Sequence, residues 1–135
     1  MIPKYRSWYV LAEEMINEIL MISFVRKEII GKFSDGSTSV PLKFEDERNG
    51  EDVILMQSTG LFDKNGKEIF EGDILDYKGR KALVRWHGSY ASFIYRFVDE
   101  LQKRNTEWKL LYLAYMKCEI IGNVYENPEL LEDKE

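Results

Sequence analysis

The chain has 135 residues, of which 44% are hydrophobic and 32% charged, so it can build one core and is too apolar to be disordered over most of its length. Its net charge of −5 argues against a general affinity for nucleic-acid phosphates. One cysteine and one histidine exclude an intrachain disulfide and the clustered ligands of a structural zinc site.

The sequence predicts neither a targeting signal nor a membrane span. The residues after Met1 show neither an apolar run nor a small-residue cleavage site, so no secretory signal is expected. The most apolar windows, 19–25 and 110–116, have seven residues each, whereas a membrane-spanning helix needs about 20. We therefore expect a cytoplasmic protein that makes no membrane contact.

The first half of the chain mixes strand and turn signals. Aromatic and β-branched residues predict a strand over 4–10. Apolar residues over 11–20 have helical spacing, which favours a helix there and leaves an extended segment as the alternative. Ser-Asp-Gly predicts a turn within 33–42, the charged stretch 43–52 reads as a loop, and the apolar run 53–59 reads as a buried strand.

Residues 61–75, LFDKNGKEIFEGDIL, carry the densest turn chemistry. Asn65-Gly66 predicts a two-residue hairpin of type I′, because both central residues of that turn need positive φ. A strand is expected after Gly72, followed by a turn at Lys78-Gly79. Alternating runs at 81–88 and 91–98 continue a series of short strands, which is typical of a small barrel or sandwich.

The C-terminal part is expected to add further strands and one helix. Residues 99–105 are polar and predict a helical turn, while 107–114 and 117–125 are strand candidates. Asn127 and Pro128 fit the N-cap and the first position of a short helix over 127–133.

Three segments together resemble the YopX family: LMQSTGLFDKNGKEIFEGDIL (55–75), VRW (84–86) and CEIIGNVYENPELL (118–131). PKYRSW (3–8), with Met15 downstream, is also similar to the N-terminal pattern of that family. The family is found in phages and prophages of mainly Gram-positive bacteria, so the resemblance implies a bacterial host. It implies a largely β fold with helical additions and a tendency to self-associate, but no agreed molecular function. It also implies an extended segment from about Met15 to Val25.

The expected fold class is therefore α+β and mostly β. It would be a small curled antiparallel sheet or SH3-like partial barrel, with N-terminal strands and a short C-terminal helix. EGDIL followed by VRW resembles SH3-like barrels at the level of fold. We expect a single domain over 1–135, in which a β segment of about 1–55 packs on a barrel-like unit of about 56–126.

Neither the acids nor the cysteine predict chemistry. The stretch from Asp63 has lysines and a phenylalanine where an EF-hand needs oxygen ligands. Asp63 should therefore start a turn, and its neighbouring acids should face water between the buried residues Leu61, Ile69, Phe70 and Ile74. These neighbouring acids are Glu68, Glu71 and Asp73. Cys118 alternates with Ile120 and is expected to be a buried, unreactive thiol rather than a nucleophile paired with His87.

Charge is unevenly distributed along the chain. Residues 77–117 carry a net charge of +6 and half of the aromatic residues, whereas 1–76 and 118–135 carry −6 and −5. Cations beside aromatic rings are typical of single-strand nucleic-acid binding. The candidate contacts are Lys78, Arg80, Lys81, Arg85 and Arg96 as cations, with Trp86 and Tyr95 as stacking platforms. Simple strand alternation, or pairing of basic and acidic regions within and between copies, would produce the same pattern.

The sequence therefore favours a non-catalytic phage or prophage protein that acts by self-association and protein–protein contact. We expect a homo-oligomer with a host or phage protein partner, and no catalytic, cofactor or metal site. Weak binding of single-stranded nucleic acid through 77–117 is the alternative.

Overall fold

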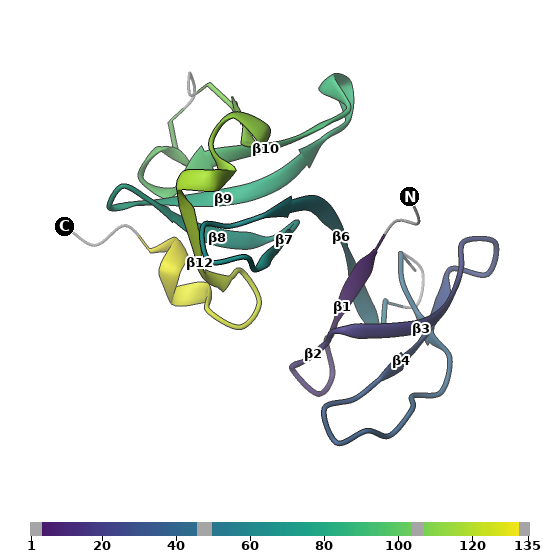
Figure 1. Cartoon of the computed structure of the whole chain (residues 1–135). Coiled ribbons are helices and arrows are strands. Elements are labelled where there is room, and N and C mark those ends of the chain that lie inside the picture. The colour runs from purple at the N-terminus through teal and green to yellow at the C-terminus, as the bar shows by residue number, and fades with distance from the viewer. Residues whose placement is uncertain (1–3, 46–49, 104–106, 133–135) are drawn as a thin grey trace. The chain divides into compact units, whose positions relative to one another are not determined.

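A computed structural model describes residues 4–45, 50–103 and 107–132, and these are mostly β (Figure 1). The strands are β1 (Tyr5–Tyr9), β2 (Glu14–Ile16), β3 (Glu18–Ser23), β4 (Glu28–Lys32), β5 (Leu42–Lys43), β6 (Val53–Phe62), β7 (Glu68–Phe70), β8 (Asp73–Tyr77), β9 (Arg80–His87), β10 (Ser92–Phe97), β11 (Lys109–Leu110) and β12 (Cys118–Asn123). Five 3-10 turns occur among the described residues: η1 (Gly88–Tyr90), η2 (Val98–Glu100), η3 (Leu111–Leu113), η4 (Tyr115–Lys117) and η5 (Pro128–Leu131).

Every strand pair is antiparallel, which confirms the mostly β prediction with a curled antiparallel sheet. The strand orders are β2-β1-β6-β7, β3-β4-β5 and β11-β10-β9-β8-β12. The chain divides into two compact units, residues 1–57 and 58–135. β6 crosses this division, pairing with β1 through its first half and with β7 through its second. The expectation of a single domain stays a prediction.

The first unit is built from two antiparallel hairpins and β5. Its core consists of Ile16, Ile29, Leu42, Phe44 and Val53. The helix favoured by local spacing over 11–20 is wrong, because the chain turns and then extends as β2 and β3. Glu13 has φ of 51°, outside the helical region, immediately before β2. The extended segment implied by the family resemblance is confirmed up to Ser23.

The second unit contains the five-stranded sheet, whose two long central strands are β9 and β10. Its core collects alternating residues from several strands, namely Ile69, Leu75, Ala82, Val84, Tyr95, Phe97, Leu111, Ala114 and Cys118. β8 and β9 are joined by a two-residue turn in which Lys78 and Gly79 have φ of 50° and 87°. Positive φ at both central positions is the requirement of a type I′ turn.

The type I′ prediction at Asn65-Gly66 is wrong, because only Gly66 has positive φ there, at 82°. The N–H of Gly66 donates to the carbonyl of Asp63 at 2.9 Å, and the N–H of Asp63 donates to the carbonyl of Lys67 at 2.7 Å. This is a three-residue hairpin loop, in which the glycine at positive φ closes the turn and no second positive φ is needed.

The predicted C-terminal helix is also wrong over the described part of 127–133, which forms only the 3-10 turn η5. Asn127 and Pro128 stand at its N-cap and first turn, as predicted, but the Asn127 side chain makes no capping hydrogen bond. The side-chain oxygen of Asn127 instead accepts from the N–H of Asn123 at 3.2 Å. That bond holds the tail against β12, beside Gly122, whose missing Cβ leaves room for the Asn127 side chain.

The strand expected over 107–114 is mostly wrong, because β11 covers only Lys109–Leu110 and two 3-10 turns follow. Leu111 and Ala114 are both buried, and their spacing of three residues matches the period of a 3-10 turn. The strand expected over 117–125 is confirmed as β12. Residues 46–49 of the predicted loop and residues 104 and 105 of the predicted helical turn lie outside the described residues. Within the described ranges, no helix has the length and apolar character required to cross a membrane.

Candidate functional site

The predicted nucleic-acid residues lie on β8, β9, β10 and the turns beside them. Arg80 is occupied by acids, since its guanidinium donates to both carboxylate oxygens of Asp99, at 2.8 and 3.2 Å, and to Glu100 at 3.0 Å. It also covers the ring of Phe97 at 3.6 Å. The hydrogen bond with Asp99 raises the pKa of Arg80 above its ordinary value. These contacts neutralise Arg80 within the second unit.

Strand register divides the remaining candidates between two faces. Opposite residues in β9 and β10 share a face, and successive residues alternate. The pairs Trp86–Phe93 and Val84–Tyr95 therefore lie on the face of the core, while Leu83–Arg96 lies on the other. Arg85 and Lys81 alternate with Trp86 and share the face of Arg96. The cations and the two rings proposed as platforms are not assembled on one surface.

Local contacts occupy several of these side chains. Tyr95 is buried and stacks on Tyr77, with ring centroids 6.0 Å apart, so it is not exposed for stacking on a base. Arg96 donates to the carbonyls of Glu100 and Lys103 at 3.1 and 2.7 Å. The ammonium group of Lys81 donates to the carbonyl of Glu132 at 3.3 Å.

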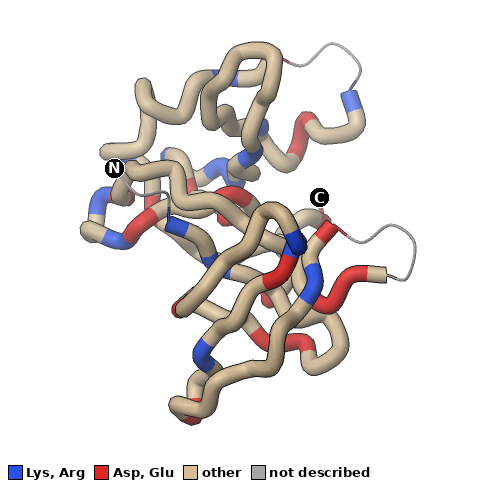
Figure 2. Tube along the Cα trace, turned by 90° about the vertical axis from the view of Figure 1, so that its right-hand side faces the viewer, with Lys and Arg blue, Asp and Glu red and all other residues tan. Residues whose placement is uncertain are grey.

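Lys78 and Trp86 are exposed, as is Arg80, whose guanidinium is already paired with acids. Lys78 lies 5.7 Å from the centroid of the Tyr77 ring. Trp86 packs edge-on against Phe93, with centroids 4.9 Å apart. Lys and Arg residues are spread along the trace with Asp and Glu between them (Figure 2). The structure does not bring the predicted contacts together on one surface, and nucleic-acid binding stays a prediction.

Asp63 starts the turn, as predicted, but it is buried, and the prediction that its neighbouring acids face water is wrong for Asp73, which is also buried. The Oδ1 atom of Asp63 accepts from the N–H groups of Asn65 and Lys67, each at 2.9 Å. Its Oδ2 atom accepts from the N–H of Ile120 at 2.9 Å. Burial raises the pKa of Asp63, but these donors, Ile120 foremost, outweigh it and leave the pKa below its ordinary value.

Asp63 consequently protects an outer strand. β12 is the last strand of the five-stranded sheet, so one of its edges has no neighbouring strand. The loop after β6 covers that edge: the N–H of Lys64 donates to the carbonyl of Cys118 at 2.9 Å, and Asp63 accepts from Ile120. Unpaired strand edges are templates for pairing with other chains, and natural proteins cover them.

Cys118 is buried, as predicted, and its thiol donates to the carbonyl of Ala114 at 3.3 Å. Burial raises the pKa of this thiol to about 11, which keeps it protonated at neutral pH. Across 4–45, 50–103 and 107–132, no cluster of three or more His, Cys, Asp or Glu side chains could hold a metal ion.

The first unit also has an outer strand, β3. β3 is the outer strand of the sheet β3-β4-β5, and residues 19–25 contain no charged residue and no proline. Four apolar side chains of this segment are exposed, with fractions of 48% for Leu20, 55% for Met21, 57% for Phe24 and 97% for Val25. We call these four residues the hairpin patch.

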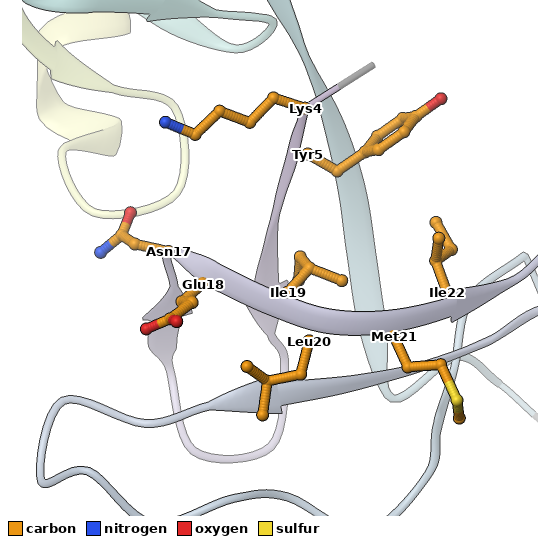
Figure 3. Close-up of a pocket in the computed structure, with 8 residues that line it drawn as sticks. All are labelled: Lys4, Tyr5, Asn17, Glu18, Ile19, Leu20, Met21 and Ile22. Carbon is orange, nitrogen blue, oxygen red and sulfur yellow. The ribbon is translucent and has the colours of Figure 1, made fainter. Parts of the chain in front are cut away.

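A bulge explains why two consecutive residues of the hairpin patch face outward. The β3–β4 register shifts between Ile19 and Met21, so Leu20 is an extra residue in β3. Leu20 and Met21 then point to one side of β3, while Ile19 and Ile22 point to the other, toward Tyr5 (Figure 3). Ile19 and Ile22 pack against the core of the unit. The outward side is left apolar and open to solvent.

A pocket of about 470 Å³ lies where β1 and β3 diverge (Figure 3). β1 pairs with β2 up to Ser7 opposite Ile16, after which the chain continues as β3 and pairs with β4 instead. The separation leaves a gap between the start of β1 and the root of β3. The pocket is lined by Lys4, Tyr5, Asn17, Glu18, Ile19, Leu20, Met21 and Ile22.

The turn between β3 and β4, residues 24–27, forms the tip of the hairpin. Phe24 is anchored edge-on between Tyr5 and Phe44, with centroid distances of 5.9 and 6.0 Å. Lys27 has φ of 55° and forms an ion pair with Glu45 at 3.4 Å. The tip is therefore an ordered structure that displays an apolar residue, Val25, to solvent.

Sequence reasoning used residues 19–25 to exclude a membrane span and to predict an extended segment, but it missed them as a surface. The available signal was an uncharged run that enters a turn at Phe24-Val25, where turn-forming residues are normally found.

These features define a small antiparallel β protein that carries an exposed apolar hairpin. The YopX protein family matches residues 4–132, so the chain belongs to the YopX family, as its motifs indicated. The crystal structure of protein EF1440 from Enterococcus faecalis is similar, with 29% sequence identity and a TM-score of 0.59 over 98% of this chain and 99% of that chain. No curated protein matches the chain.

Proposed function

We propose that this YopX-family protein is non-catalytic and acts through contact with other protein chains, with self-association as its first activity. The hairpin patch is the observation that carries this proposal. An exposed large apolar residue is common when isolated, but several on one ordered hairpin are typical of an interaction site. Removing such side chains from water supplies the driving force for association, at about 25 cal/mol per Å².

The setting follows from the family. Its phage and prophage distribution supports a role in the cytoplasm of a bacterial host, with a host or phage protein as a further partner. The ionisable groups that are most perturbed also support a non-catalytic role. Asp63 holds backbone N–H groups, Arg80 is paired with two acids, and Cys118 stays protonated. Each of these groups is committed to holding the fold.

Size-exclusion chromatography with light scattering at micromolar concentrations tests this role. The wild type should be larger than one chain, and Met21→Lys should weaken self-association at least about tenfold, because a charge would have to be buried. Val40→Lys is the matched control, since Val40 is an exposed apolar residue of the same unit outside the hairpin patch. Both variants should unfold within about 0.5 kcal/mol of the wild type.

A strictly monomeric wild type would refute self-association. Equal losses in Met21→Lys and Val40→Lys would show that the hairpin patch is not the contact.

A further inference from the structure

We propose that the second unit also binds single-stranded nucleic acid, through a face that the sequence did not single out. This face consists of Arg85, His87, Tyr90, Arg96 and Trp108, and we call it the Trp108 face. A base would stack on the exposed rings of Tyr90 and Trp108, while Arg85 would hold a phosphate of the same strand. This binding does not depend on self-association through the hairpin patch.

Strand register gathers these residues on one side of the five-stranded sheet. Arg85 and His87 are two positions apart in β9, so their side chains point the same way. Arg96 of β10 pairs with Leu83 of β9, which puts Arg96 on that same side. The Cζ atom of Arg96 lies 5.0 Å from the centroid of the Trp108 ring, and the rings of Trp108 and His87 are 6.4 Å apart. Trp108 therefore shares the side of the two arginines.

The rings of the Trp108 face are held in place and are still exposed. Tyr90, in η1, stacks on His87 with ring centroids 4.4 Å apart and an angle of 24° between the ring planes. Tyr90 is 66% exposed and Trp108 is 37% exposed. Since His87 covers one side of the Tyr90 ring, the other side is open to a base. Stacking of this kind accepts any base, because every base has a flat π face.

Charge on this side of the sheet favours a polyanion. Residues 80–98 contain four Lys and Arg residues and no acid. Arg80 is paired with acids that follow this segment, but the half-buried guanidinium of Arg85 has no hydrogen bond or ion pair within 4–45, 50–103 and 107–132. A cation that is partly removed from water without an acid gains free energy when an anionic ligand arrives. Glu107, beside Trp108, is an exposed acid and should keep the affinity modest.

A protein partner could also cover these rings, since aromatic residues and arginine are enriched at protein–protein contacts. Protein surfaces carry charges of both signs, whereas the segment from β9 to the end of β10 lacks acids altogether. That run of one sign favours a ligand in which every unit is negative, and nucleic acid also supplies the flat rings. The two occupants differ in how binding depends on salt and on base stacking.

Fluorescence anisotropy at low salt, with a labelled oligonucleotide of about 8 nucleotides and mixed sequence, tests the proposal. The wild type should bind single-stranded DNA or RNA more tightly than a stable hairpin duplex, because the bases of a duplex are already stacked. Tyr90→Ala and Trp108→Ala should each weaken binding at least about fivefold, which corresponds to the loss of one stacked base. Arg85→Ala should reduce the slope of log affinity against log salt by about 0.7, the value for one phosphate of a single strand.

Trp86→Ala and Lys78→Ala are the matched controls. Trp86 is 44% exposed, much like Trp108, but it lies on the opposite side of β9. Lys78 is an exposed cation in the turn before β9, at the other end of that strand from His87. Neither control should weaken binding comparably. Should Trp108→Ala fail to fold, Tyr90→Ala and Arg85→Ala still decide the outcome, since both side chains reach solvent.

His87 provides a second measurement, because it is the single histidine of the chain and its imidazole NMR signals need no assignment. A base stacked on Tyr90 should shift these signals through its ring current. The oligonucleotide should produce this shift in the wild type and a smaller one in Tyr90→Ala, whereas inorganic phosphate, which has no ring, should leave the signals nearly unchanged.

Three results would overturn the proposal: no binding of either oligonucleotide by the wild type, equal binding of the duplex, or equal losses in Trp86→Ala and Trp108→Ala. Absence of binding would leave the Trp108 face to a protein partner. Met21→Lys should bind the short oligonucleotide as the wild type does. A failure of nucleic-acid binding therefore leaves self-association untouched, and a monomeric wild type leaves nucleic-acid binding untouched.

Discussion

The outer strands β12 and β3 each have a strand edge with no neighbouring strand, and the two edges differ in what lies beside them. At β12 a loop covers the edge, and the buried carboxylate of Asp63 accepts the N–H of Ile120. At β3 no charge or proline interrupts residues 19–25, and the bulge at Leu20 turns apolar side chains outward. The two outer strands therefore differ: the loop that carries Asp63 covers β12, whereas β3 exposes apolar side chains to solvent.

The largest expected effect comes from removing the acceptor that covers β12. Asp63→Asn keeps the shape of the side chain but replaces one of two accepting oxygens with a donor, so one buried N–H loses its partner. We expect a loss of about 1–3 kcal/mol in the free energy of unfolding, measured by urea denaturation. Amide hydrogen exchange at Ile120 should also accelerate.

Glu119→Gln is the control for that change, since Glu119 lies on the same strand and contacts Lys64 and Asn65 from an exposed position. It should cost less than about 1 kcal/mol. Equal losses in both variants would mean that Asp63 does not cover the edge in the way described.

The pH dependence of Asp63 sharpens the same comparison. Folding lowers the pKa of Asp63. The carboxylate therefore contributes fully to the free energy of unfolding above the pKa of the unfolded state, about 3.9, and this contribution is lost as the pH falls through the pKa of the folded state. The gap in unfolding free energy between wild type and Asp63→Asn should therefore be widest at pH 7 and narrow below about pH 4. Denaturation at pH 7, 5 and 3 measures it, and a gap that widened in acid would contradict the assigned protonation.

A smaller loss is expected when the loop that carries Asp63 is strained. Gly66 has φ of 82° with no atom near the position of a Cβ, so Gly66→Val would be opposed by backbone conformation and not by collision. We expect a cost of about 1–3 kcal/mol, toward the lower end because the loop is exposed. Gly66→Asn should cost less, because Asn tolerates positive φ better. Calorimetric melting of the two variants would show no difference if the strain were absent.

Much of the strand order was predictable because alternation and glycine turns are local signals. Runs with a period of two predict β8, β9, β10 and β12. The family resemblance predicts an extended segment over 15–25, where local spacing favoured a helix over 11–20. Periodicity alone could not do so, since the apolar residues of 11–20 satisfy both patterns and only pairing with β1 and β4 decides between them.

The misplaced type I′ turn has an equally physical cause. Asn-Gly is the stronger local signal, but the carboxylate of Asp63 draws in the N–H groups of Asn65 and Lys67 and fixes a three-residue loop. The two-residue loop falls instead at Lys78-Gly79, where the register pairs Tyr77 with Arg80 and leaves no longer connection. Burial of an acid 57 residues away in sequence from its partner Ile120 is not visible in a local pattern.

Local sequence patterns also could not predict which residues share a surface, neither for the nucleic-acid candidates nor for the hairpin patch. Cations beside aromatic rings in sequence suggested one face, yet alternation sends Arg85 and Trp86 to opposite sides of β9. Conversely, Leu20 and Met21 are exposed together because of a bulge, which exchanges the two faces for every later residue of the strand.

β6 has a consequence for how the chain can be divided. Residues 57 and 58 belong to different compact units, yet they are neighbours within one uninterrupted strand. A break at this point would leave residues 53–57 paired with β1 and residues 58–62 paired with β7, although the two units are joined by a continuous strand and not by the dispensable tether that normally links separable modules. Each half expressed alone would therefore keep the strand pairs of its own unit and would lose only the continuity of β6.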